Sequence, residues 1–361
     1  MKTKFLVPLI VAAVLVLAGG PAAPASADNT AATYHQIALI TVPGAPLTSF
    51  DISFVERSSQ TYYLADRTNK GVDIFDASAN TFETRVGGFV GQSALGNEHS
   101  GPNGVVVVHD RNELWAGDGD STVKVIDLGT NSIVASISTL GTARADEIAY
   151  DQKDKLILVA NDADDPPFAT LIDTQSRVVV AKISFDDATN GLEQPVWDPE
   201  THLFYISVPQ IGADPNNGGI AVVDPQTGSR VETFTVKNCQ PAGLALGPKQ
   251  HLLLGCSGDN SVLETRGAQV QIMDARTGEI VAVIKQVGGA DEVWYNPGDK
   301  HYYVAARNNP SGPVLGVIDA MTNTWIQNVP TGRNAHSVAA NPINDEIFVP
   351  LRGMGIGVYH Q

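Results

Sequence analysis

Cysteine, long apolar runs and basic residues are scarce in this 361-residue chain, and each shortage excludes a class of protein. Only two cysteines occur, Cys239 and Cys256, without the CxxC spacing typical of metal or redox sites. Beyond the first residues, no apolar run approaches the roughly twenty residues that span a bilayer. Lys and Arg number 23 against 39 acidic residues, which argues against nucleic acid as a partner because basic surfaces hold phosphate backbones.

Sequence signatures of common enzymes are also missing. The chain has no G-x-S-x-G elbow, no H-E-x-x-H, no P-loop, and no G-x-G-x-x-G between a strand and a helix. No nucleotide or organic cofactor is therefore indicated, and whether the protein is an enzyme stays open.

The first 27 residues have the pattern of a secretory signal peptide. Lys2 and Lys4 precede an apolar stretch over residues 5–17, and Ala25-Ser26-Ala27 matches an A-x-A cleavage site. The apolar stretch is too short to cross a bilayer. We therefore expect an exported chain, periplasmic or secreted, that begins near Asp28 and has no membrane span.

Export places the two cysteines where disulfides persist. If Cys239 begins one strand and Cys256 ends the next strand of a hairpin turning near residues 247–248, antiparallel pairing brings them close enough to bond. A soft-metal or nucleophilic thiol pair is the alternative interpretation.

An internal repeat indicates the fold. Its mark is an apolar strand that ends in Asp, followed by a short polar turn and a second β-rich strand. Six copies end at Asp76, Asp127, Asp173, Asp224, Asp274 and Asp319. Their spacing of about 45 to 50 residues falls in the range of propeller blades, and each Asp is expected to accept hydrogen bonds from turn amides.

Two more strands precede each copy, which gives four strands per repeat and predicts an all-β, seven-bladed β-propeller. A single domain is expected over residues 28–361. The predicted blades cover residues 48–91, 97–141, 142–190, 192–237, 238–287, 288–333 and 334–361. The last repeat supplies only three strands, so we expect the N-terminal strand over residues 34–42 to complete the last blade and remove a free sheet edge.

The chain resembles a known family of propellers. The runs Pro241-Ala242-Gly243-Leu244-Ala245-Leu246-Gly247-Pro248 and Ile220-Ala221-Val222-Val223-Asp224-Pro225-Gln226-Thr227-Gly228 are similar to those of YncE-like, YVTN-repeat proteins. A literal YVTN run is absent, and Tyr302-Tyr303-Val304-Ala305 stands in its place. The resemblance implies an exported seven-bladed propeller but does not choose an activity, because that family and its neighbours include binding modules, lactonases and lyases.

Candidate functional residues lie where the first strands of the blades begin. These strands line the axis of a propeller, so their starts converge on one mouth of the central channel. Aligning the predicted blades places Asp51, Asn103, Asp146, Gln194, Ala242, Asp291 and His336 near one ring. Glu98, His99, Glu147, Glu193 and Glu292 lie beside them in the sequence. We expect an acidic mouth that receives a small molecule or a protein partner.

Such a mouth also suits a divalent cation. Oxygen ligands favour calcium, and His99 with His336 would permit a transition metal. The predicted metal ligands are Asp146, Asp291, His336 and Asn103. The alternative is that these polar residues are simply solvated at a wet channel mouth.

Loops that leave the second strand of each blade should share the face of the mouth. Arg67, Arg307 and Arg352 lie in these loops, where a guanidinium could hold a carboxylate ligand or neutralise the acidic ring. Asp118-Gly119-Asp120 and residues 162–165 resemble fragments of calcium loops, but they lack the closing Glu and are better explained as turns.

Two hypotheses for the function follow. In the first, the protein is an exported ligand-binding or protein-interaction propeller without covalent chemistry. In the second, it is a metal-dependent hydrolase or lyase of the lactonase type, acting on a small carbonyl or ester substrate. Glu147, Glu292 or His99 would then be the general base, and Arg307 or Arg352 would stabilise the oxyanion.

Overall fold

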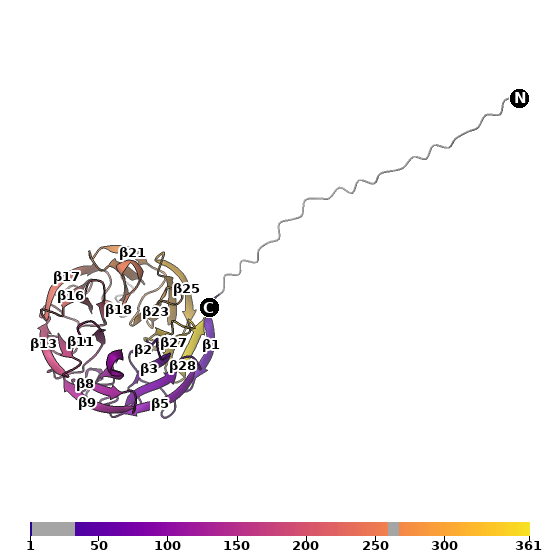
Figure 1. Cartoon of the computed structure of the whole chain (residues 1–361). Coiled ribbons are helices and arrows are strands. Elements are labelled where there is room, and N and C mark those ends of the chain that lie inside the picture. Colours follow the sequence, from indigo (N-terminus) through magenta and orange to yellow (C-terminus); the bar gives the residue numbers. More distant parts are fainter. Residues whose placement is uncertain (2–32, 259–266) are drawn as a thin grey trace. The chain divides into compact units, whose positions relative to one another are not determined.

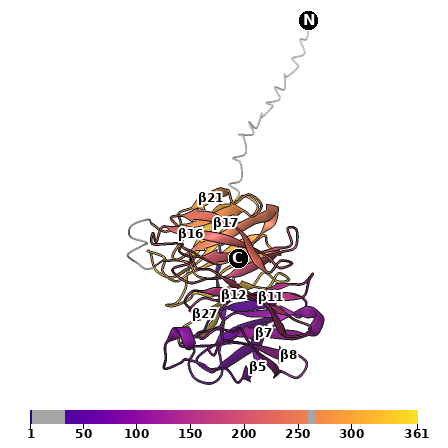
Figure 2. The same ribbon diagram turned by 90° about the vertical axis from the view of Figure 1, so that its left-hand side faces the viewer.

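Seven antiparallel sheets of four strands are arranged in a ring in the computed structural model (Figure 1). The structure describes Met1 and residues 33–258 and 267–361, so the predicted signal peptide lies outside the described residues apart from Met1. Figure 2 shows the ring from its edge. These sheets confirm the predicted seven-bladed propeller.

In the first six blades, the strands follow the chain from the axis outward. The first three blades consist of β2 (Ser53–Glu56), β3 (Thr61–Asp66), β4 (Gly71–Asp76) and β5 (Thr81–Gly87); β6 (Val105–Val108), β7 (Glu113–Gly117), β8 (Thr122–Asp127) and β9 (Ser132–Ser138); and β10 (Ile148–Asp151), β11 (Leu156–Asn161), β12 (Phe168–Asp173) and β13 (Val178–Ser184). The next three consist of β14 (Pro195–Asp198), β15 (Leu203–Val208), β16 (Asn217–Asp224) and β17 (Ser229–Lys237); β18 (Pro241–Leu246), β19 (His251–Cys256), β20 (Val270–Asp274) and β21 (Ile280–Ile284); and β22 (Val293–Asn296), β23 (His301–Ala306), β24 (Val314–Asp319) and β25 (Thr324–Pro330). Three short 3-10 helices, η1 (Asn97–His99), η2 (His109–Arg111) and η3 (Pro248–Gln250), lie in described connections.

The seventh blade closes the ring with strands from both ends of the chain. It consists of β26 (Ala339–Ala340), β27 (Ile347–Leu351), β28 (Gly355–His360) and the N-terminal β1 (His35–Ile40). β1 pairs antiparallel with β28, from His35 opposite His360 to Ile40 opposite Ile356. The prediction that the N-terminal strand completes the last blade is therefore confirmed, and Figure 1 shows β1 beside β28.

The repeated Asp ends the third strand of each of the first six blades and organises the turn to the fourth strand. In the first blade, Asp76 Oδ1 accepts hydrogen bonds from the backbone N–H groups of Ser78 and Ala79. In the sixth, Asp319 Oδ1 accepts them from Met321 and Thr322. Carboxylates that satisfy turn amides in this way have a structural role, as the repeat predicted.

Apolar side chains between neighbouring blades form the core. One cluster, for example, joins Leu158 and Leu171 of the third blade to Phe204 and Ile206 of the fourth. The innermost strands β2, β6, β10, β14, β18, β22 and β26 contact one another in order around the axis. The residues that precede these strands are consequently brought to one end of the central channel.

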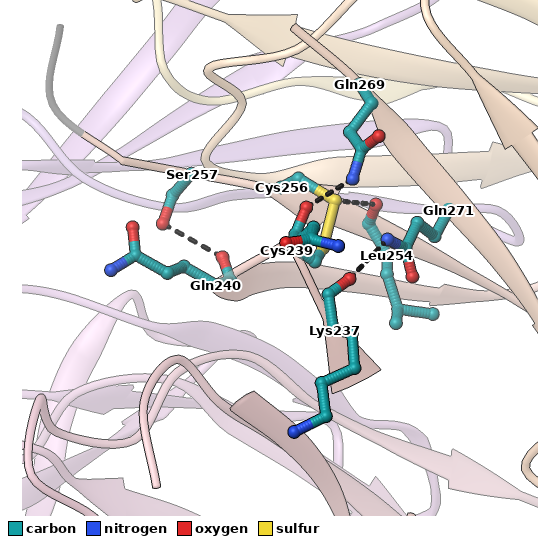
Figure 3. Close-up of a disulfide and its surroundings, with 9 residues drawn as sticks. Lys237, Cys239, Gln240, Leu254, Cys256, Ser257, Gln269 and Gln271 are labelled. Atoms are coloured by element: carbon teal, nitrogen blue, oxygen red, sulfur yellow. Dashed lines mark hydrogen bonds between the residues drawn. A yellow bond between two sulfur atoms is a disulfide. The ribbon is translucent and has the colours of Figure 1, made fainter. Parts of the chain in front are cut away.

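A disulfide joins the start of β18 to the end of β19. Cys239 and Cys256 are bonded and fully buried (Figure 3), as the sequence predicted, and Pro241 pairs with Cys256 in the hairpin. Gln271 donates a hydrogen bond to the carbonyl of Lys237 beside the bridge. The disulfide thus fixes the inner hairpin of the fifth blade at the end where β18 begins.

Candidate functional site

A polar cavity of about 190 Å³ lies at the end of the channel where the inner strands begin. We call it the mouth. Its charged lining residues are Asp51, Arg67, Arg144, Asp146, Glu147, Glu193, Asp291 and Arg307, together with His336. They come from blades widely separated in sequence, because each precedes an inner strand or follows a second strand.

Arg67 is the most buried of the three arginines that line the mouth. It follows β3, is 4% exposed, and its guanidinium pairs with the carboxylate of Asp51. Its Nε donates to Asn103 Oδ1 at 3.0 Å, and its Nη1 donates to Asn97 Oδ1 at 3.1 Å. Asn103 in turn donates to the carbonyl of Ala145 at 2.7 Å. Asn103 therefore orients an arginine that lines the mouth.

Arg144 links two further carboxylates. Its Nη2 lies 2.8 Å from Asp146 Oδ2, and its Nε and Nη2 bind Asp162 in a two-pronged contact at 3.0 and 2.6 Å. Within the described part of the chain, Asp146 Oδ1 is buried and has no hydrogen-bond partner. One oxygen of this carboxyl group is thus left for a ligand.

The third arginine and the histidine are arranged differently. Arg307 Nη1 lies 2.9 Å from Asp291 Oδ2, and its side chain is 36% exposed. His336 Nδ1 donates to the carbonyl of Asn334 at 2.9 Å, which directs Nε2 towards Asp51 Oδ1 at 3.5 Å. The imidazole ring stacks on Phe50, with centroids 4.7 Å apart, so packing and a backbone acceptor fix its orientation.

Burial and charge crowding set the protonation of the mouth. Burial raises the pKa of Glu147 well above its usual range, and Glu193 and Asp146 raise it further. Burial likewise raises the pKa of Glu193, with Asp291 adding to the effect. Burial also raises the pKa of Asp146, although Arg144 opposes the shift. Asp51 differs: burial raises its pKa, but Arg67 and His336 outweigh this and hold it well below the usual value. A positive charge entering the mouth would relieve the crowding.

Of the nine residues predicted as metal ligands, general bases or oxyanion-stabilising arginines, the structure brings five together. Asp146, Asp291, His336, Glu147 and Arg307 all line the mouth. The four others lie elsewhere. Asn103 is buried against Arg67, and Glu292 lies beyond the mouth, where its Oε2 accepts hydrogen bonds from Ser337 and Val338. His99 is on η1, Arg352 is exposed in the turn after β27, and neither lines the mouth.

Sequence reasoning missed Arg144 and Asn97. Arg144 stands two residues before the predicted ring position Asp146, so its place next to an inner strand start was visible, but its partners were not. Asp162, which the sequence assigned to a turn, is one of those partners. Neighbouring Asp164 does serve its loop, since it accepts a hydrogen bond from the backbone N–H of Thr142 at 2.8 Å.

The mouth fits a bare metal ion poorly as it stands. Among the described residues, no group of three or more His, Cys, Asp or Glu side chains is placed to hold a metal ion. Asp51, Asp146 and Asp291 each face an arginine. A cation coordinated by these carboxylates would have to displace guanidinium groups that already neutralise them.

Comparisons with known proteins identify the fold. No family model matches the chain, and no curated protein matches it. Among solved structures, hydrazine synthase from Kuenenia stuttgartiensis is similar, with a TM-score of 0.70 over 88% of this chain and 96% of that chain. The identity is 16%, so this likeness shows a shared propeller architecture and carries no activity across. Among the helices that are described, none has the length and hydrophobicity that a membrane crossing needs.

Proposed function

We propose that this protein is a ligand-binding propeller whose mouth takes up a small polar ligand carrying positive charge. The observation that carries this proposal is the mouth itself, a preformed polar cavity with five carboxyl groups and three arginines. Propellers commonly present binding sites where their inner strands begin, but the ligand must be argued from the side chains.

The unequal pairing of acids and arginines favours a cationic ligand. The three arginines neutralise Asp51, Asp146 and Asp291. Glu147 and Glu193 complete the lining, and no ion pair joins either of them to a basic side chain of the described ranges. The pKa values of these two carboxyl groups are raised, and a bound ammonium group would stabilise their charged forms.

Isothermal titration calorimetry with 1,4-diaminobutane tests this proposal, with uncharged 1,4-butanediol as the matched control ligand. We expect the diamine to bind and the diol not to bind. Glu193→Gln keeps the shape of the side chain and removes its charge, so it should weaken diamine binding by about tenfold, equivalent to about 1.4 kcal/mol. Arg352→Gln, which changes an exposed residue outside the mouth, should leave affinity unchanged. Equal binding of diol and diamine, or an unaffected Glu193→Gln variant, would refute a cation-selective mouth.

A divalent cation in the mouth is the second occupant to test, since the lactonase-type hypothesis requires one. Metal analysis of the purified protein, with Asp291→Ala and His336→Ala as comparisons, separates the two. If the purified protein contains stoichiometric metal and both variants lose it, the occupant of the mouth is an ion and not an organic ligand. That result would support the hydrolase or lyase hypothesis. Metal content below stoichiometry and unchanged in the variants would remove it.

Export is part of the proposed function. The disulfide between Cys239 and Cys256 agrees with an oxidising compartment, and the N-terminal pattern supplies the route. We infer that the mouth meets its ligand outside the cytoplasm.

A further inference from the structure

A second cavity, separate from the mouth in its chemistry, lies along the channel. Its volume is about 400 Å³, and its lining includes Phe54, Tyr150, Trp197, Trp294 and Tyr295. We call it the chamber. It extends to His109, Gln152 and Pro199, which follow the inner strands β6, β10 and β14, so it lies towards the face opposite the mouth. The two cavities share Ile52 and Glu147.

The chamber wall is aromatic, and its rings are accessible. All five aromatic side chains are partly exposed, unlike the fully buried Trp115, Tyr205 and Phe204 of the blade cores. Phe54 meets Trp294 edge to face, with centroids 5.5 Å apart. Rings fixed against each other around open space offer their faces to an apolar or cationic group.

Two buried carboxyl groups interrupt this apolar wall. Glu292 is 1% exposed and Glu147 is 5% exposed, and both line the chamber. Ser337 and the backbone N–H of Val338 hold Glu292 by its Oε2. Its Oε1, like Glu147 Oε2, is buried without a hydrogen-bond partner anywhere in the described ranges of the chain. An unsatisfied buried oxygen costs free energy unless a ligand supplies a partner.

We propose that the chamber is a second ligand site, which binds an organic cation with an apolar body through its aromatic walls and the carboxyl groups of Glu292 and Glu147. The walls exclude water, and the face of an aromatic ring attracts a cation placed above it. The carboxylates supply the counter-charge. A neutral hydrophobic ligand would leave both oxygens unpartnered. An inorganic ion would leave the aromatic surface unused.

The chemistry of the two carboxyl groups agrees with this assignment. Burial raises the pKa of Glu292 well above its usual range, against the opposing hydrogen bonds from Ser337 and Val338. Asp51 raises it further, and Tyr62 and Glu147 also interact with Glu292. A bound cation would favour the charged form, so binding should strengthen as pH rises and Glu292 loses its proton.

Benzyltrimethylammonium is a direct probe, because neopentylbenzene has the same shape without the charge. Titration followed by tryptophan fluorescence reports on Trp197 and Trp294. We expect benzyltrimethylammonium to bind at least about tenfold more tightly than neopentylbenzene, a difference of about 1.4 kcal/mol. Glu292→Gln, which retains the acceptor for Val338, should abolish that preference and the rise in affinity with pH.

Two further variants separate this site from the mouth and from misfolding. Glu193 lines the mouth and not the chamber, so Glu193→Gln should leave the preference for benzyltrimethylammonium over neopentylbenzene intact while weakening the diamine. Trp294→Phe keeps a ring face and should retain binding, whereas Trp294→Leu should lose it at an unchanged circular dichroism spectrum. Equal binding of the charged and neutral probes, or full charge preference in folded Glu292→Gln, would overturn the proposal whatever the outcome at the mouth.

Discussion

Removing Arg144 tests whether the arginines of the mouth stabilise the fold by neutralising buried carboxylates or behave as solvent-exposed charges. Arg144 is 12% exposed and contacts both Asp146 and Asp162, whose side chains are 4% and 13% exposed. Arg144→Met keeps much of the apolar stem and deletes the charge. Breaking a buried ion pair by removing one partner costs about 3–5 kcal/mol, because the other charge stays uncompensated.

Arg307→Met is the matched control. Arg307 also pairs with an aspartate of the mouth, but it is 36% exposed and solvent screens its charge. Its loss should lower the free energy of unfolding by about 1 kcal/mol or less. Urea unfolding followed by tryptophan fluorescence measures both variants against the parent protein.

The pH dependence of the Arg144→Met effect has a definite sign. Burial already holds the pKa of Asp146 above its usual value, and loss of Arg144 raises it further. Below about pH 3, the carboxyl group is largely protonated in both the folded and unfolded states and carries no penalty. As the pH rises towards the folded-state pKa, the unfolded state ionises and folding becomes less favourable. The variant should therefore lose more stability near pH 7 than near pH 4.5, and equal losses for Arg144→Met and Arg307→Met at every pH would refute the reasoning.

Three further predictions concern the ring that supports the mouth. Replacing both Cys239 and Cys256 with serine opens a loop with a sequence separation of 17 and should cost about 3 kcal/mol, seen as a lower urea midpoint. An unchanged midpoint would contradict it. Gly243→Ala would place a Cβ 2.1 Å from the carbonyl oxygen of Asp291, so it should destabilise the fold by about 1–3 kcal/mol and weaken diamine binding in calorimetry. Unaltered binding and stability would show that the strands separate freely. Deleting residues 33–42 removes buried Tyr34, Ile40 and Val42 and uncovers β28, which should cost about 5 kcal/mol and promote aggregation in light scattering; a stable monomeric variant would contradict ring closure by β1.

The sequence was informative about architecture because each blade repeats the same local rules. An Asp at the end of a strand, such as Asp76 or Asp319, satisfies turn amides next to it, so its role depends on nearby residues alone. The pairing of β1 with β28 followed from counting strands, since a three-stranded last repeat leaves an edge for the first strand to fill. The ring alignment also placed Asp146, Asp291 and His336 at one mouth.

The residues that line each cavity and the partners of Arg144 could not be predicted, because they depend on the direction and length of side chains. Glu147 and Glu292 follow equivalent ring residues, yet Glu147 lines both cavities whereas Glu292 lines only the chamber. Alternation along a strand makes such assignments sensitive to a shift of one residue. The pairing of Arg144 with Asp162 spans 18 positions and depends on the packing of two loops. The aromatic chamber was missed because the sequence alone does not show that the side chains of Trp197 and Trp294, on two different blades, line one cavity.

Proton release on ligand binding reports whether a cation relieves the crowded carboxyl groups of the mouth. Calorimetry of 1,4-diaminobutane near pH 7, where both amines stay protonated, in buffers of different ionisation enthalpy gives the number of protons released. We expect the parent protein to release protons on diamine binding and the Glu193→Gln variant to release fewer. Diamine binding without proton release, or with proton uptake, would contradict this expectation.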